Sequence, residues 1–322
     1  MNRKAAVIDM GTNTFHLLLV QVKGRKFQTL YKEKIPVKIG QGGISQNTIL
    51  PEAQKRAFHT LAHFKNLIAG ENIEETAIFA TSAVRNATNG ESFVRQIREK
   101  FDLHVEIIDG QREAELIYGG IKLSGCLGTS TSLMMDIGGG SVEFIIGNQE
   151  EIFWKGSFEI GGQRMLDLFH NQDPIRSTDV ENLKIYLGQK LSPLIKAIET
   201  LKPHNLVGAS GTFDTLSDIY EAKSGVKKDR HSQQHQIPIA EFEEISSQLI
   251  GLNKQERLKI KGMIPMRVDM IVVASCLIQH ILSHIQVTSI ICSSYSLKEG
   301  AVAELFHKKT GNVFESLAAM EK

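Results

Sequence analysis

The sequence contains little cysteine and no recognisable targeting signal. Its 322 residues include three cysteines, Cys126, Cys276 and Cys292, and no Cys-x-x-Cys motif. A small, odd number of scattered cysteines is typical of reduced core residues in a cytosolic protein rather than of a disulfide framework. Asp9 interrupts the N-terminal apolar run too early for a signal peptide. We therefore expect a cytoplasmic protein.

Long hydrophobic runs and an excess of one charge are also missing. The longest apolar segment, 270–292, contains Gln279, His280, His284 and Gln286, so it predicts a buried helix followed by a strand rather than a spanning helix. The 37 Lys and Arg residues nearly balance the 36 Asp and Glu residues, which gives a formal net charge of +1. This balance argues against a dedicated nucleic-acid or membrane surface, so we expect neither as a partner.

Several catalytic signatures are absent as well. The sequence has no Gly-x-Ser-x-Gly elbow, and no Gly-x-Gly-x-x-Gly follows an expected strand, which argues against a serine hydrolase of that type and a nicotinamide enzyme. Three histidine pairs have i, i+4 spacing, but none has the glutamate of a zinc hydrolase or an evident third ligand. We interpret them as helix-surface or loop residues. The pairs are His59 and His63, His231 and His235, and His280 and His284.

The most informative stretch that is present spans residues 133–147. An apolar run leads to Asp136, three glycines follow at 138–140, and Ser141 and Glu143 precede a second apolar run. Two strands joined by a tight turn fit this pattern. Consecutive glycines also allow backbone N–H groups to converge on an anion, and two adjacent carboxylates suit a phosphate that carries Mg²⁺. The alternative is an ordinary glycine hairpin.

Residues 9–20 repeat this pattern at a constant offset of 127 positions, the separation of Asp9 from Asp136. Gly11 likewise matches Gly138, Thr14 matches Ser141, and the apolar residues 17–19 match 144–146. The repeat predicts two copies of one unit, whose facing turns would bracket one phosphate-bearing ligand. The copies differ, because Asn13 replaces Gly140 and His16 replaces Glu143, so one turn would bind and the other would add chemistry. Chance similarity of two short segments is the alternative.

The length and the pattern of elements predict two α/β domains. In each half, three antiparallel strands precede strands that alternate with helices, which is typical of a mixed sheet with helical crossovers. Strands are expected at 5–10, 15–22, 27–35, 76–80, 104–108, 133–137, 142–146, 152–158, 205–209 and 289–292. Helices are expected at 51–69, around Arg95 and Arg98, at 111–123, after Gly162, at 180–198, 239–250, 254–258 and 265–285, and from Lys298. Residues 222–236 lack periodicity and predict a loop.

Glu113 and Arg85 are candidates for chemistry beside the first turn. Glu113 lies near the start of the helix after strand 104–108, where a carboxylate commonly interacts with the helix dipole. Its alternative role is a general base that orients and deprotonates the water that attacks a phosphoanhydride. Arg85 follows strand 76–80 at the same sheet end, where its planar fork suits a phosphate, although a lone arginine is usually a solvated residue.

Two further segments are candidates for binding anions. Ser210, Gly211 and Thr212 form a strand-to-helix turn, and a helix N-terminus is a ready anion site. A basic stretch contains Arg257, Lys259, Lys261 and Arg267. That stretch is either a solvated face or the outer part of a ligand cleft.

These motifs occur together in a specific order. They are Asp9 to Thr14, Asp109 to Ala114, Asp136 to Glu143, Gly208 to Thr212, Gly262 with Arg267 to Asp269, and Leu297 to Gly300. Nearly the whole chain resembles the exopolyphosphatase / guanosine pentaphosphate phosphohydrolase family, of the actin–hexokinase–heat-shock-chaperone superfamily, in its short two-domain form. The resemblance implies two ribonuclease H-like domains, each with a mixed five-stranded sheet and helices, and an active-site cleft between them. The first domain would span 1–125, with the C-terminal helix 301–322 packing back on it, and the second domain would span 126–300.

The resemblance also implies roles for individual residues. Glu113 matches the water-activating carboxylate, Glu143 matches the second catalytic acid, and Asp136 with Glu143 would hold Mg²⁺. The phosphate-binding candidates are Thr12, Asn13, Thr14, Arg85, Gly138, Gly139, Gly140, Ser141, Ser210, Gly211 and Thr212. Arg267 and Lys298 would lie in the outer cleft. Lys298 stands where the family often has arginine, and the lysine lacks the bidentate fork.

The expected function is Mg²⁺-dependent removal of the terminal phosphate from polyphosphate, guanosine pentaphosphate or both, with a slight preference for polyphosphate. Two alternatives stay open: a superfamily kinase that phosphorylates a small hydroxyl or carboxylate acceptor, and a non-catalytic sensor of a guanosine alarmone. The sequence does not decide the chain-length preference, the need for a monovalent cation, or whether the chain forms a homodimer.

Overall fold

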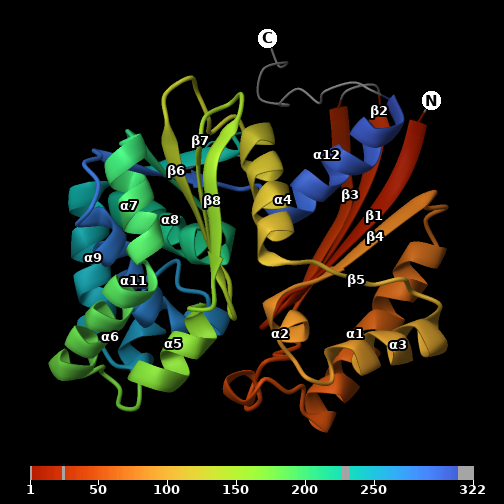
Figure 1. Cartoon of the computed structure of the whole chain (residues 1–322), viewed down its shortest axis with the longest axis horizontal. Coiled ribbons are helices and arrows are strands. Elements are labelled where there is room, and N and C mark those ends of the chain that lie inside the picture. The colour runs from red at the N-terminus through yellow and green to blue at the C-terminus, as the bar shows by residue number, and fades with distance from the viewer. Residues whose placement is uncertain (1, 24–25, 227–228, 230–231, 311–322) are drawn as a thin grey trace. The chain divides into compact units, whose positions relative to one another are not determined.

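The computed structural model describes residues 2–23, 26–226, 229 and 232–310. His231, part of the predicted loop 222–236 and the predicted C-terminal segment after Thr310 lie outside the described residues. The chain divides into two compact units (Figure 1). Unit 1 comprises Met1–Leu123 and Leu297–Lys322, and unit 2 comprises Ser124–Ser296. The domain limits 1–125 and 126–300 stay predictions.

Unit 1 contains a five-stranded mixed sheet in the order β3-β2-β1-β4-β5. Its strands are β1 (Asn2–Met10), β2 (Phe15–Lys23), β3 (Lys26–Ile35), β4 (Glu75–Ala80) and β5 (Glu106–Ile107). The first three are antiparallel neighbours, while β4 is parallel to β1 and β5 is parallel to β4. This confirms the predicted strands, although β5 is shorter than the predicted 104–108 because only its two residues pair with β4.

Helices cover the sheet of unit 1. They are α1 (Pro51–Ala69), α2 (Ser82–Arg85), α3 (Gly90–Phe101), α4 (Gly110–Leu123) and α12 (Leu297–Thr310), with a 3-10 turn, η1, at Ile44–Gln46. Pro51 opens α1, where its missing N–H has no helical partner to lose. Helix α12 packs against α4 and β1. A Cβ on Gly300 would lie 1.8 Å from the Leu116 carbonyl oxygen, so the close approach of α12 to α4 requires glycine.

Unit 2 contains a six-stranded mixed sheet in the order β10-β11-β9-β6-β7-β8. Its strands are β6 (Ser132–Ile137), β7 (Val142–Gly147), β8 (Ile152–Phe158), β9 (Asn205–Ala209), β10 (Gln234–Pro238) and β11 (Ser289–Ser293). Five of them were predicted, and the sixth, β10, overlaps the stretch predicted as a loop. The loop prediction was wrong at 222–224, which belong to α8, and at 234–236, which belong to β10. Strand β10 is an edge strand in which Ile237 is the one buried residue, so its sequence shows no repeated apolar signal.

The helices of unit 2 include two departures from prediction. They are α5 (Gly162–Phe169), α6 (Ser177–Lys190), α7 (Ser192–Leu201), α8 (Ser210–Ser224), α9 (Ile239–Gly251), α10 (Lys254–Arg257) and α11 (Met270–Leu282), with a 3-10 turn, η2, at Pro265–Arg267. The predicted helix 180–198 is two helices, because Pro193 has no N–H to donate to the preceding turn and instead lies in the first turn of α7. Similarly, 265–285 divides into η2 and α11.

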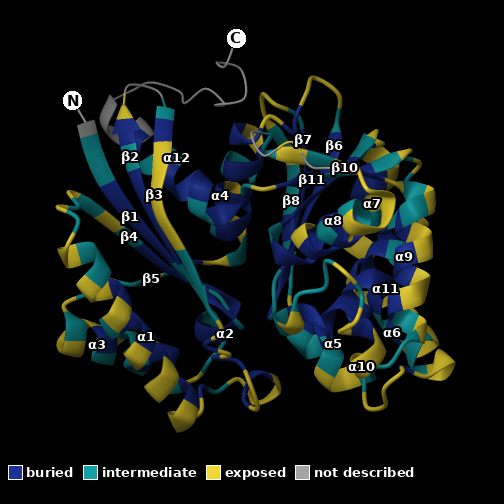
Figure 2. Ribbon diagram, turned by 180° about the vertical axis from the view of Figure 1, so that it is seen from behind, coloured by how far each residue is buried: buried dark blue, intermediate teal, exposed yellow. Residues whose placement is uncertain are grey.

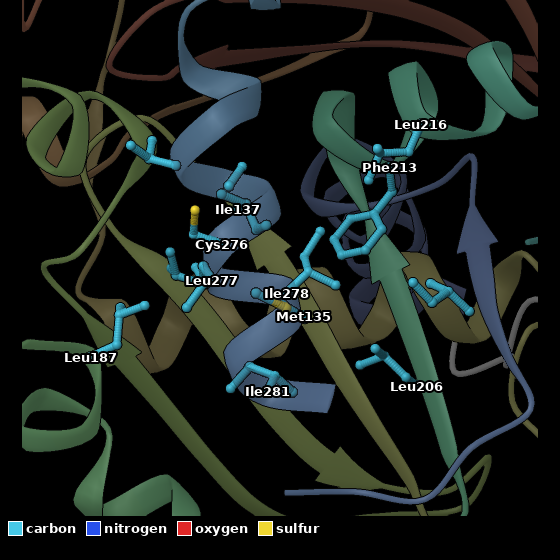
Figure 3. Packing of buried hydrophobic residues seen from close by; sticks show 14 of the residues in the cluster. Met135, Ile137, Leu187, Leu206, Phe213, Leu216, Cys276, Leu277, Ile278 and Ile281 are labelled. Atoms are coloured by element: carbon cyan, nitrogen blue, oxygen red, sulfur yellow. The ribbon is translucent and has the colours of Figure 1, made fainter. Parts of the chain in front are cut away.

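The core of unit 2 surrounds its central strands and α11. Every residue of β6 and β7 is buried, which shows that both faces of the sheet are covered (Figure 2). Cys276 and Ile278 of α11 belong to the same buried cluster as Met135, Ile137 and Phe213 (Figure 3). In the part of the chain that the structure describes, no helix is both long and apolar enough to cross a membrane.

Candidate functional site

In unit 1, the parallel strands bring three chain segments to one edge of the sheet. Met10 of β1 is opposite Ala80 of β4, which in turn is opposite Ile107 of β5. The turn after β1, helix α2 after β4 and helix α4 after β5 therefore begin at neighbouring strand ends. The carboxyl end of parallel strands is where α/β proteins place ligands. The segments that carry the predicted residues 12–14, Arg85 and Glu113 therefore all start there.

The turn after β1 is held by backbone hydrogen bonds on both sides. The Gly11 N–H donates to the Thr14 carbonyl at 3.1 Å, and the Thr12 and Asn13 carbonyls accept from the N–H groups of Gly40 and Lys38 at 3.1 and 2.8 Å. A Cβ on Gly40 would lie 2.6 Å from the Thr12 Cγ2 atom, so glycine allows this loop to pack against the turn. Thr12 and Thr14 are buried, and the position of Asn13 is fixed through its carbonyl.

Glu113 is a buried carboxylate that is paired with Arg85. Its Oε2 atom lies 2.8 Å from Nη1 of Arg85, which also donates to the Ile108 carbonyl at 3.0 Å. The N-terminus of α4 is capped instead by Asp109, whose Oδ1 accepts from the Arg112 N–H at 2.7 Å. Glu113 is only 7% exposed. Because Asp109 caps the helix, capping does not account for this buried carboxylate.

In unit 2, the glycine turn between β6 and β7 presses against the start of α5. The carbonyls of Gly138, Gly139 and Gly140 accept from three consecutive amides, those of Gly162, Gln163 and Gly161, at 2.8 to 3.1 Å. No hydrogen bond among the described residues uses the N–H groups of Gly139, Gly140 or Ser141. The turn therefore has its carbonyls satisfied from α5 while these consecutive amides stay available to an anion.

Asp136 lies at the end of β6 and receives two serine hydroxyls. Ser210 Oγ donates to its Oδ2 at 2.7 Å, and Ser296 Oγ donates to the same oxygen. Ser210 begins α8 directly after β9 and has a left-handed backbone with φ of 69°. Such a conformation is unfavourable for a residue other than glycine and is common at functional sites. The predicted Asp136 and Ser210 are thus in direct contact.

Glu143 faces Asp136 across the β6–β7 pair. The two residues are opposite each other in the antiparallel register, so their side chains are on the same face of the sheet. Glu143 is 1% exposed, and Ser157 of β8 donates its hydroxyl to Oε1 at 2.7 Å. Two carboxylates close together on one face repel each other, which a bound cation would offset.

Arg267 is buried against the N-terminus of α8. A Cβ on Gly211 would lie 2.3 Å from its Nη2 atom, so the guanidinium occupies the space that a larger residue would fill. Arg267 is 9% exposed, and its Nε has no hydrogen-bond partner in the described part of the chain. Burial lowers the pKa of Arg267, and the nearby Asp214 and Asp136 partly offset this. An arginine in this situation provides positive charge and unused donors for an anion.

The sequence also offered the basic stretch 257–267 and Lys298 as candidates for binding an anion. The interpretation of the stretch 257–267 as a solvated face is wrong for Arg257 and Arg267, because both are buried. Arg257 donates to the Leu252 and Val268 carbonyls. Lys298 belongs to unit 1, at the start of α12, with its Nζ 3.9 Å from a carboxylate oxygen of Glu299.

Sequence reasoning missed the residues that support the candidate site. These residues are Asp109, which lies within a motif but has no catalytic signature of its own, and Ser157 and Ser296, which lie outside every motif. Ser157 is opposite Glu143 in the β7–β8 register, so the predicted sheet pairing contained a signal for it. Ser296 lies in a loop, where no periodicity could indicate its contact with Asp136.

Comparisons with known proteins identify the family and the fold. The family model for the Ppx/GppA phosphatase family matches residues 18–309. A crystal structure of an exopolyphosphatase from Cytophaga hutchinsonii ATCC 33406 is similar, with a TM-score of 0.91 and 42% identity, and the match covers 98% of this chain and 100% of that one. The crystal structure of the Aquifex aeolicus Ppx/GppA family member has a TM-score of 0.81 at 21% identity, covering 96% and 99%, and supports the fold.

A curated relative is longer. The guanosine-5'-triphosphate,3'-diphosphate pyrophosphatase of Photobacterium profundum is 27% identical over 304 residues. The match covers 94% of this chain and 59% of that protein, so this chain spans somewhat more than half of the relative's length. The family match itself covers most of the chain and both units. The chain therefore belongs to the Ppx/GppA phosphatase family.

Proposed function

We propose that this chain hydrolyses the terminal phosphoanhydride bond of polyphosphate or guanosine pentaphosphate, with Glu113 as the base that activates water. The observation that carries the proposal is the buried Glu113–Arg85 pair at the carboxyl ends of β1, β4 and β5. Glu113 is not needed to cap α4, and Arg85 holds its carboxylate in a fixed orientation, which is typical of a catalytic residue. Family membership and the name of the Cytophaga relative support the reaction class.

The phosphate chain would be bound by backbone and side-chain donors whose positions the fold already fixes. The N–H groups of Gly139, Gly140 and Ser141 and the first turn of α8 offer donors without a long side chain to order. Arg267 adds a cation beside Gly211. In unit 1, the turn of Thr12, Asn13 and Thr14 is the counterpart of this glycine turn in the duplicated sequence pattern, and we propose that it also binds phosphate.

Asp136 and Glu143 fit a magnesium ion. Mg²⁺ is usually bound by one or two carboxylates, together with water and substrate phosphate oxygens, rather than by a complete protein cage. This matches the paired carboxylates of Asp136 and Glu143, which lie opposite each other in the β6–β7 register. When bound, Mg²⁺ would offset charge on the phosphates. Ser210 and Ser157 would keep the two carboxylates in position.

In the proposed reaction, the protein itself takes part in one chemical step, the transfer of a proton from water to Glu113. Glu113 would accept a proton from water while the water oxygen forms a bond to the terminal phosphorus. The bond between that phosphorus and the bridging oxygen breaks, so the products are orthophosphate and a substrate shortened by one phosphate. The glycine amides and Arg267 would stabilise charge that develops on the phosphoryl oxygens.

We also propose that the enzyme acts in the cytoplasm and binds no nucleic acid.

The test compares phosphate release from long polyphosphate and from guanosine pentaphosphate, each with and without Mg²⁺. Glu113→Gln should lower kcat by roughly a hundredfold or more, because general-base catalysis contributes about 10²–10⁴, while KM changes little. Glu115→Gln is the matched control, since it changes an exposed carboxylate on the same helix. A Glu113→Gln enzyme with near wild-type turnover would remove Glu113 as the base, and no release from either substrate would refute the proposed activity.

A further inference from the structure

Ser296 contacts the candidate cation site from an element that no sequence motif assigned to it. Its hydroxyl donates to Oδ2 of Asp136 and lies 3.5 Å from the hydroxyl of Ser210. Ser296 is buried, and it follows β11, whereas Ser210 follows β9. Two donors from two different strand ends therefore converge on one carboxylate oxygen.

The turn that carries Ser296 is itself fixed. Ser293, the last residue of β11, donates its hydroxyl to the Tyr295 carbonyl at 2.7 Å and accepts from the Tyr295 N–H at 3.2 Å. The same hydroxyl is 2.9 Å from that of Ser124. Both Ser293 and Ser124 are buried. The position of Ser296 is consequently set by its own turn rather than by the carboxylate that it contacts.

Both serine hydroxyls donate to Oδ2 of Asp136, and no residue that the structure describes donates to Oδ1. A carboxylate with one oxygen held from two sides cannot rotate without breaking a buried hydrogen bond, which costs about 1–3 kcal/mol. The arrangement leaves Oδ1 to serve a ligand. Groups that hold a metal-binding carboxylate in this way are as much a part of a metal site as the ligands themselves.

We propose that Ser296 is a positioning residue that orients the Asp136 carboxylate for a divalent cation. The inference rests on the proposed function in one respect, because it takes Asp136 to be a cation ligand. It goes further in assigning a role to a residue outside the motifs. The role needs only a hydroxyl at position 296, so threonine should substitute for serine and alanine should not.

The test measures binding of Mn²⁺ alone to the full chain, by the electron paramagnetic resonance signal of the free ion. Ser296→Ala should weaken Mn²⁺ binding about tenfold, the lower end of the effect of losing such a supporting group. Ser296→Thr should restore most of the affinity. In phosphate-release assays, Ser296→Ala should raise the half-saturating Mg²⁺ concentration more than it lowers kcat at saturating Mg²⁺, which a general loss of folding would not do.

The control is Ser246→Ala in α9. Ser246 is also buried, donates to the Glu243 carbonyl at 3.1 Å and accepts from Gln279 at 2.8 Å, so its alanine variant loses comparable bonds away from the site. It should leave Mn²⁺ binding unchanged. If Asp136→Asn weakens Mn²⁺ binding but Ser296→Ala does not, the role of Ser296 is refuted and the proposed function stands. If Asp136→Asn has no effect, or the wild-type chain binds no Mn²⁺, the cation assignment fails and this inference fails with it.

Discussion

At the scale of single residues, Arg85 illustrates how one side chain can serve structure and chemistry together. Its Nη1 donates to both the Glu113 carboxylate and the Ile108 carbonyl, which joins α2 to the end of β5 and the start of α4. The guanidinium is a planar fork with five N–H donors, a shape that suits a phosphate as well as the two acceptors that Nη1 holds. The contact with Glu113 means that substrate binding and base orientation would depend on the same residue.

Replacing Arg85 by lysine tests this double role. A lysine at this position would keep the charge but not the fork, so it could not hold both acceptors in the same geometry. We expect Arg85→Lys to lower kcat by roughly tenfold to a hundredfold and to raise KM, measured by phosphate release. Arg95→Lys, an exposed change on α3, should have no effect. Equal activity of Arg85→Lys and the wild type would show that the Glu113 carboxylate does not need this partner.

At the scale of secondary structure elements, the sequence predicted the strands well and failed where an element lacks periodicity. The alternating and apolar strands were found because sheet burial leaves a clear pattern. The edge strand β10 has a single buried residue, and α2 is a single turn, so neither produces a repeated signal. The break between α6 and α7 depends on the single residue Pro193, which lies in the first turn of α7, while the apolar pattern continues across it.

The candidate site, like the secondary structure elements, was predictable in part from the sequence. Motifs identified Asp136 and Ser210, which are hydrogen bonded, and placed Arg85 and Glu113 beside the same strand ends. What they could not identify were contacts between segments that lie far apart in the sequence, such as Ser296 against Asp136. The burial of Arg267 was also hidden, because its position depends on how η2 packs on α8, a tertiary contact without a local signature.

The packing of α5 on the glycine turn gives a prediction for these two elements. A Cβ on Gly161 would lie 2.4 Å from backbone carbons of Gly139 and Gly140, and backbone atoms cannot move aside as a flexible side chain can. Gly161→Ala should therefore displace the turn, destabilise unit 2 by about 1–3 kcal/mol and raise KM several-fold. Thermal unfolding and phosphate-release kinetics measure the two effects.

Gly128→Ala is the matched control for Gly161→Ala. Gly128 lies in the same unit, and an added Cβ there meets no atom within 4 Å. It should leave both stability and KM near the wild-type values. Wild-type kinetics in Gly161→Ala would contradict the assignment of the glycine turn as a phosphate cradle, whatever the change in stability.

At the scale of the whole molecule, two histidines make the stability of unit 2 depend on pH. Burial lowers the pKa of His170 and of His280 below the ordinary 6.5, and both residues belong to unit 2. For His280, the neighbouring His284 and Lys184 lower the pKa further. The Nε2 atom of His280 is buried and, among the described residues, has no hydrogen-bond partner to stabilise the charged ring. A proton on either ring is therefore more costly in the folded unit than in the unfolded chain.

The pH dependence of stability follows from these shifts. Below pH 6.5 the unfolded chain binds protons that the folded unit does not, so the free energy of unfolding of unit 2 is highest above pH 6.5 and decreases as the pH falls toward the lowered pKa values. Urea unfolding at about pH 7.5 and about pH 5.5, one unit on either side of the ordinary histidine pKa, measures the difference. The fluorescence of Trp154, the one tryptophan of the chain, is a reporter in β8 of unit 2.

His280→Gln should reduce the loss of stability between the two pH values, since glutamine takes up no proton. His204→Gln, an exposed change in the same unit, should not. If the two variants lose equal stability on acidification, burial of His280 does not make unit 2 sensitive to acid.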